Sequence, residues 1–257
     1  MSDNANYYGN FKSSSASKRG QVGLSIAKVY GYMFLGLLIT AAIALGLGAY
    51  FGNVLLKDAS SDLPTRFQST NAIILLVLLI TSFIGIIVLS FVVPITIARG
   101  RRSVLLPSII YTVLMGIMLS TLAMVIDWSI LGITFGITAL IFGLMSLIAL
   151  LSKGRLNGLA IAAMGLFIGA GILSLVLWIL MLVGFFSGTL YWIVSLSVFV
   201  AVMLITIWDM ARIKAIAQNG EMTTNISLYC AFILYNDFIY IFLRILRIVI
   251  LVLGNRR

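Results

Sequence analysis

The chain has 257 residues, of which 62% are apolar and only 9% are charged, and its formal net charge is +10. Soluble domains carry about 25% charged residues, so this composition excludes a soluble globular enzyme and indicates an all-α membrane protein. The chain has no histidine and a single cysteine, Cys230, which excludes Ser-His-Asp triads, histidine zinc sites, internal disulfides and thiolate clusters. We therefore predict no enzymatic activity and no cofactor.

The first segment, residues 1–20, is polar, rich in Ser and Asn, and basic toward its end. Such a segment cannot bury enough apolar surface to offset the entropy of ordering, so we predict a disordered cytoplasmic tail. The remaining residues, 21–257, are predicted to form one transmembrane domain.

Seven apolar runs follow the tail, and each is long enough to cross about 30 Å of hydrocarbon as a helix. Membrane strands would show alternation over about ten residues, which these runs lack. The sequence therefore predicts a seven-transmembrane-helix bundle, whose helices cover residues 28–50, 72–98, 104–126, 130–151, 159–183, 190–211 and 226–253.

The basic residues predict the orientation of this bundle. Eleven of them fall in the tail and in the connections after the second, fourth and sixth runs, against four on the opposite side. By the positive-inside rule, the protein is a multi-pass cell-membrane protein with a cytoplasmic N-terminus. The same rule accounts for the positive charge, so the predicted partner is the lipid bilayer and not nucleic acid. Arg256 and Arg257 leave the side of the C-terminus open.

Two of the seven acidic residues, Asp209 and Asp237, lie within apolar runs. A carboxylate at membrane depth costs several kcal/mol and normally faces a bundle interior with a partner. If the two lie together, they cannot both ionise at low cost, so they are expected to share a proton and to sense pH without histidine. Two carboxylates are too few for a tight calcium site but suffice for a weak one. The alternative for Asp209 is an interfacial pair with Arg212.

The seventh run carries further polar residues at helical spacing. Asp237, Tyr240, Arg244 and Arg247 fall at i, i+3, i+7 and i+10, which is one face of a helix. Such a face does not turn toward lipid, so we predict that helix seven is central and is surrounded by the others. Arg244 is expected to lean toward Asp237. The alternative for both arginines is that they extend toward the membrane interface.

Glycines at a spacing of four indicate close helix packing in two other runs. Gly132 and Gly136 form one such pair, and Gly165 and Gly169 form the other. Pairs of this kind let helix backbones approach each other within a membrane.

Five segments together resemble the Bax inhibitor-1 family, also called YccA-like proteins. The segments are KVYGYMFLGLLIT from Lys28, YTVLMGIMLS from Tyr111, FGITALIFGLMSL from Phe135, WDMARIK from Trp208 and LYNDFIYIFLRILRI from Leu234. The last two are similar to the family motifs YDxxxIK and LYLDFINLFxxLLR. Trp208 and Arg244 depart from the family pattern, in which Tyr and a neutral polar residue are usual.

The resemblance implies a seven-helix bundle with helix seven in the middle and a pH-dependent calcium leak. Asp209 and Asp237 would then act as a proton-sensing latch. An arginine after the second helix would stabilise the closed form, and Arg99, Arg101 and Arg102 are the candidates. The positive charge of Arg244 is expected to favour ionised carboxylates and to weaken calcium passage.

Other functions remain open at this point. The main alternative is a regulatory membrane protein without transport activity that binds a membrane AAA protease through its polar tail. A proton-coupled transporter is disfavoured, because the sequence shows neither an inverted repeat nor a pair of broken helices. Calcium and protons are the ions expected to act on the leading candidate, and calcium flux separates it from the regulatory alternative.

Overall fold

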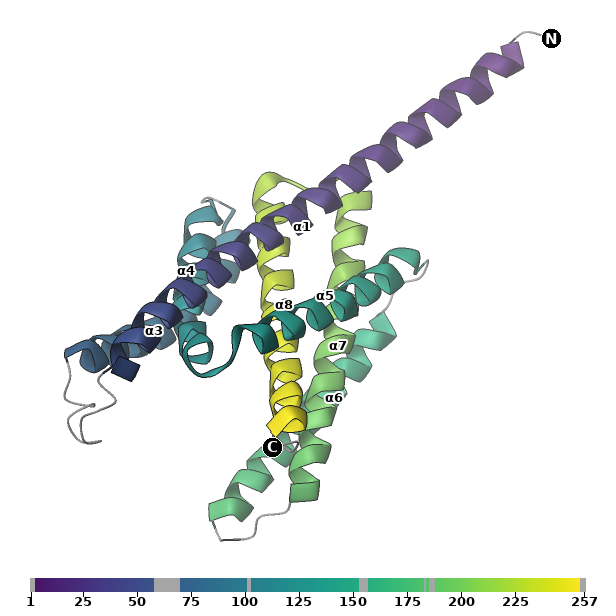
Figure 1. Cartoon of the computed structure of the whole chain (residues 1–257). Coiled ribbons are helices and arrows are strands. Elements are labelled where there is room, and N and C mark those ends of the chain that lie inside the picture. Colours follow the sequence, from purple (N-terminus) through teal and green to yellow (C-terminus); the bar gives the residue numbers. More distant parts are fainter. Residues whose placement is uncertain are drawn as a thin grey trace. The chain divides into compact units, whose positions relative to one another are not determined.

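The computed structural model describes residues 3–57, 70–100, 103–152, 157–182, 184 and 188–254. These residues form seven helices and contain no strand. The helices are α1 (Asp3–Lys57), α3 (Thr70–Ala98), α4 (Leu105–Val125), α5 (Trp128–Leu151), α6 (Asn157–Leu182), α7 (Gly188–Gln218) and α8 (Thr224–Gly254) (Figure 1). In the part of the chain described, seven helices are long and apolar enough to cross a membrane. The predicted seven-helix fold is confirmed.

The first helix begins at Asp3, so it runs through the segment for which the composition predicts a disordered tail. Its apolar, membrane-length part is Gly20–Val54. The side chains of residues 3–19 lie outside the described residues, and the boundary at residue 20 stays a prediction.

The chain divides into two compact units. The first comprises residues 1–131 and 219–235, and the second comprises residues 132–218 and 236–257. The last helix, α8, contributes its first half to one unit and its second half to the other.

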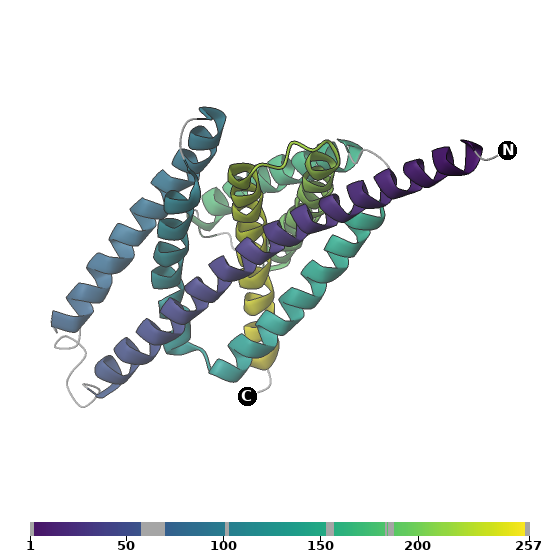
Figure 2. The same cartoon turned by 90° about the horizontal axis from the view of Figure 1, so that it is seen from above.

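In the first unit, α4 packs against both α1 and α3 (Figures 1 and 2). A buried polar contact fixes this arrangement, because the Thr40 hydroxyl donates to the Thr112 carbonyl at 3.0 Å and lies 2.6 Å from the Tyr235 hydroxyl. Tyr235 also makes an edge contact with Tyr111, whose ring packs against Phe232 at a centroid distance of 4.8 Å. Small residues permit the close approach, since a Cβ at Gly116 would lie 2.8 Å from the Ile43 Cβ.

The predicted close-packing glycine pairs are not where helices approach. A Cβ added at Gly132, Gly136, Gly165 or Gly169 would meet nothing within 4 Å. That prediction is wrong, because spacing alone does not tell which face of an apolar helix meets a neighbour. Tight glycine positions are instead Gly48 and Gly116, in the contact between α1 and α4, and Gly85, whose Cβ would lie 2.5 Å from a methyl group of Leu114.

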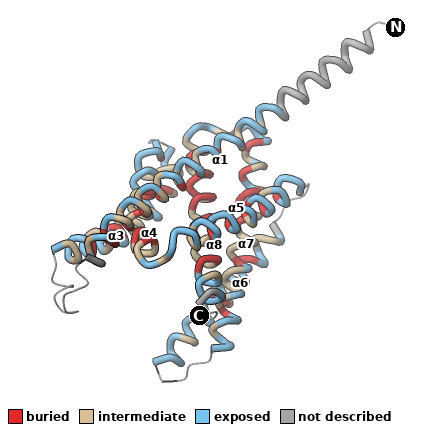
Figure 3. The backbone as a smooth tube through the Cα atoms, viewed as in Figure 1, coloured by how far each residue is buried: buried red, intermediate tan, exposed pale blue. Residues whose placement is uncertain are grey.

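The last helix is the most enclosed. In its apolar window 61% of the residues are buried, against 28% or less in each other helix (Figure 3). This high burial agrees with the predicted enclosure of helix seven. Helices α3 and α6 are apolar on nearly every face, yet only 11% and 6% of the residues in their apolar windows are buried. This is typical of helices that turn most of their surface to lipid.

Candidate functional site

The second unit contains both aspartates that the sequence singled out. Asp209 is on α7 and is 8% exposed, and Asp237 is on α8 and is 9% exposed. The two side chains interact electrostatically with each other. Two like charges in a buried site of low dielectric are costly.

Thr206 lies one turn before Asp209 on α7 and connects the two helices. Its side chain is fully buried and forms a hydrogen bond with that of Asp237. Its hydroxyl also donates to the Val202 carbonyl at 2.9 Å. The other oxygen of the carboxyl group, Oδ2 of Asp237, is buried and has no hydrogen-bond partner among the described residues. A buried polar atom without a partner is uncommon and costly, and such atoms concentrate at functional sites.

The two carboxyl groups differ in their charged neighbours. Asp209 interacts with Arg212, whose guanidinium carbon lies 5.5 Å from the centre of the Trp208 ring. Asp237 interacts with Asp209 and Thr206, and the adjacent Phe238 packs against aromatic rings of α5. The ring distances are 5.3 Å to Phe135 and 5.5 Å to Phe142. Arg212 therefore acts on Asp209, and the interfacial pairing of these two residues stays a prediction.

The end of α7 beyond the aspartate is fixed by Lys214. Its ammonium group donates to the carbonyls of Leu150 at 2.6 Å and Ser152 at 2.8 Å. These carbonyls end α5, and a cation there satisfies acceptors that a helix terminus leaves free and complements its dipole. Thr206 and Lys214 were both missed from the sequence. The one available signal was their position on α7, since Lys214 ends the motif that contains Asp209.

The last helix does not present its four polar residues as one buried face. Tyr240 is 58% exposed and Arg247 is exposed, whereas Arg244 is half-buried. Arg99 is exposed at the end of α3 in the first unit. Arg101 and Arg102 lie outside the described residues.

Arg244 does not lean toward Asp237 as the sequence predicted. Its guanidinium Nη1 donates to the Ser195 hydroxyl at 3.1 Å. Ser195 and Thr206 are about 16 Å apart along α7, whereas Arg244 and Asp237 are about 10 Å apart along α8. The Arg244 side chain therefore extends away from Asp237, toward the C-terminal end of α8. Side chains on a helix generally tilt toward its N-terminus, but a long arginine side chain gains more by extending its guanidinium toward the water near the end of the helix.

The described residues contain no group of three or more His, Cys, Asp or Glu side chains that could hold a metal ion. Two carboxyl groups can gain and lose protons, and they can attract a cation weakly when a proton leaves.

Comparison with known proteins shows which family the chain resembles. The family model described as "Inhibitor of apoptosis-promoting Bax1" matches residues 23–257. The inner membrane protein YbhL of Escherichia coli K12 is 31% identical over 238 residues, which cover 90% of this chain and 92% of that protein. The uncharacterized protein RP147 of Rickettsia prowazekii is 34% identical over 151 residues, which cover 58% of this chain and 60% of that protein. No solved structure matches significantly.

Proposed function

The chain belongs to the Bax inhibitor-1 family of multipass membrane proteins, and from this membership and the buried aspartate pair we propose that it is a proton-gated calcium leak. It passes calcium passively across the membrane, and the protonation of Asp209 and Asp237 sets whether the path is open. Its similarity to an inner membrane protein supports a location in the inner membrane, and its basic connections support a cytoplasmic N-terminus.

The observation that carries this proposal is the pair of buried carboxyl groups on α7 and α8, one of which has an unpartnered oxygen. Thr206 has one hydroxyl hydrogen, and a carbonyl such as that of Val202 can only accept. That hydrogen can be given to Val202 or to the Asp237 carboxylate, so Thr206 can serve Asp237 with or without its proton. The positive charge of Arg212 acts on Asp209 and favours a negative charge there, so the proton that the pair shares is proposed to lie on Asp237.

Loss of that proton changes what the helices can do. Asp237 would then be a buried anion beside a second carboxylate. Repulsion between the carboxylates would drive α7 and α8 toward another arrangement, and the freed oxygens would attract calcium. The arginines Arg99, Arg101 and Arg102 are the proposed partners of the closed form.

The test is calcium flux into liposomes that contain the purified protein, measured from pH 5 to pH 8. Wild type should show a flux that depends on pH. Asp237→Asn and Asp209→Asn should each give a flux that does not change with pH, because an amide cannot titrate in this range.

Asp127→Asn is the matched control, because Asp127 is an exposed acidic residue in the turn before α5 and is expected to leave the pH profile unchanged. Flux with the same pH profile in all four proteins would contradict the proton-sensing role. No flux from any of them would favour the regulatory, protease-binding alternative.

A further inference from the structure

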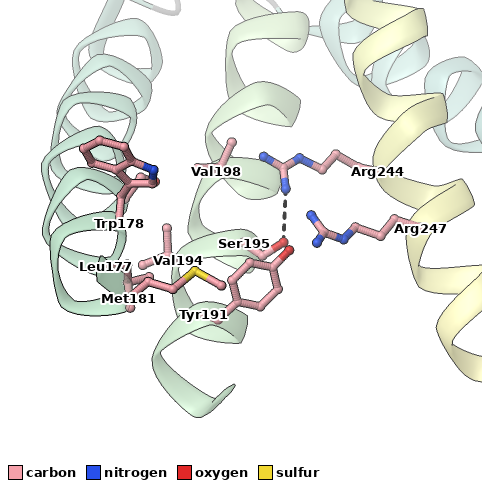
Figure 4. A pocket seen from close by; sticks show the side chains of 10 residues that line it. Leu177, Trp178, Met181, Tyr191, Val194, Ser195, Val198, Arg244 and Arg247 are labelled. Atoms are coloured by element: carbon pink, nitrogen blue, oxygen red, sulfur yellow. Dashed lines mark hydrogen bonds between the residues drawn. The ribbon is translucent and has the colours of Figure 1, made fainter. Parts of the chain in front are cut away.

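A cavity of about 270 Å³ lies within the second unit at a place that the aspartate pair does not use. Helices α6, α7 and α8 line it. Trp178 and Met181 come from α6, Tyr191 and Ser195 come from α7, and both Arg244 and Arg247 come from α8. Figure 4 shows the two guanidinium groups pointing from α8 toward α7, with the α6 side chains facing them.

The two arginines bring two positive charges to this cavity. Arg244 donates to Ser195 at 3.1 Å, and the guanidinium carbon of Arg247 lies 4.9 Å from the centre of the Tyr191 ring. Within the described part of the chain, neither arginine forms an ion pair with a carboxylate. Each guanidinium has five N–H donors, so most of these donors have no acceptor in the protein.

The depth of the cavity matches that of lipid head groups. Helices α7 and α8 have 31 residues each and so are about 46 Å long, which exceeds the hydrocarbon thickness of about 30 Å by roughly 8 Å at each end. Arg247 lies seven residues before the end of α8, and Tyr191 lies three residues after the start of α7. The arginines are therefore near the boundary between hydrocarbon and head groups, where Trp and Tyr are also enriched.

We propose that this cavity binds the phosphate head group of an anionic phospholipid. The arginines donate to the phosphate oxygens, as guanidinium groups do with paired geometry. Trp178, Met181 and Leu177 form the apolar wall along which the lipid continues toward the hydrocarbon. The volume suits a head group and not a whole lipid, and the position at the membrane boundary favours a lipid over free phosphate.

The first test measures lipids retained by the purified protein in neutral detergent, by native mass spectrometry. Phosphatidylglycerol, phosphatidylcholine and inorganic phosphate are added separately. Wild type should retain phosphatidylglycerol at least tenfold more strongly than phosphatidylcholine. Arg244→Gln with Arg247→Gln should lose that preference, since each charge-assisted hydrogen bond contributes about tenfold or more.

Lys28→Gln is the control, because it removes an exposed cation in the first unit, outside the cavity. It should retain phosphatidylglycerol as wild type does. Equal retention of the two lipids by wild type, or an unchanged preference in the arginine variant, would overturn the proposal. Inorganic phosphate that binds and prevents retention of phosphatidylglycerol would assign the site to free phosphate and overturn the lipid assignment.

A second measurement needs no arginine variant and so stays decisive if that variant does not fold. Brominated phosphatidylglycerol should quench the fluorescence of wild type more than brominated phosphatidylcholine does, because Trp178 lines the cavity. Trp178→Phe should lose that difference. Quenching that is equal for the two lipids, or a difference that persists in Trp178→Phe, would contradict the proposed site.

Discussion

Thr206 has a single hydroxyl hydrogen, which can go to the Val202 carbonyl 2.9 Å away or to the carboxyl group of Asp237. A hydrogen bond that Thr206 donates to an ionised Asp237 favours loss of the proton. Arg212 provides a positive charge that acts on Asp209. Within the proposed function, this charge favours a proton on Asp237 over one on Asp209.

Thr206→Val tests the part that Thr206 plays. Loss of the hydroxyl removes a hydrogen bond that favours the ionised carboxylate of Asp237, so the proton should leave less easily. We expect the midpoint of the pH-dependent flux to move to higher pH by up to about one unit, since a hydrogen bond contributes about 1 kcal/mol.

Thr138→Val is the matched control for this change. Thr138 is also fully buried and donates to a carbonyl one turn earlier, at 2.8 Å, but it does not bond to an aspartate. Its replacement should leave the midpoint unchanged. Equal shifts in both variants would mean that Thr206 acts through packing and not through the proton.

At the level of single residues, the sequence identifies the two aspartates because carboxylates are rare in long apolar runs. It could not identify Thr206, since threonine is an ordinary residue in membrane helices. It also could not predict that Arg244 turns to Ser195, because a long flexible side chain takes its direction from its surroundings.

Among the helices, α1 and α4 show how small residues are used. A Cβ at Gly116 would lie 2.8 Å from the Ile43 Cβ and 3.0 Å from the Thr40 carbonyl oxygen. The same Thr40 carries the hydroxyl that bonds to Thr112 and Tyr235. A change at Gly116 therefore disturbs both the packing of α1 on α4 and a buried polar contact.

Gly116→Ala should lower the stability of the first unit by about 1–3 kcal/mol, because an added methyl group has no room and a backbone atom cannot move aside cheaply. Gly136→Ala is the control, since a Cβ there meets nothing within 4 Å and alanine favours a helix over glycine. Thermal unfolding in detergent measures both. Equal unfolding temperatures for the two variants would contradict the tight contact.

Helix number and approximate bounds follow from the sequence because each apolar run is long and its ends are marked by charged or small residues. The faces on which helices meet do not follow. Gly116 and the pair Gly132 and Gly136 look alike in sequence, and only the neighbour present in the folded chain distinguishes them.

For the whole molecule, an apolar surface replaces the charged surface of a soluble protein. Large apolar side chains are exposed along most helices, including α3 and α6. Contact with lipid makes such exposed apolar side chains stable. Composition alone was enough to predict this, because 9% charged residues cannot cover a soluble protein of this size.

If all seven helices cross the membrane, the two termini lie on opposite sides. With the proposed cytoplasmic N-terminus, alkaline phosphatase fused after Arg257 should be active, because this enzyme forms its disulfides only outside the cytoplasm. The same enzyme fused after Gln218, at the end of α7, should be inactive. Activity of the second fusion alone would reverse the orientation, and inactivity of both would mean that α8 does not cross.

The central claim is that Asp237 gains and loses a proton in the pH range that controls the leak. Infrared difference spectra of the protein in lipid vesicles, recorded between pH 5 and pH 8, report this proton through the C=O stretch of a protonated carboxyl group. The account predicts one such band in wild type that disappears as the pH rises, that persists in Asp127→Asn and that is absent from Asp237→Asn. A wild-type spectrum without a titrating carboxyl band, or the same band in Asp237→Asn, would contradict it.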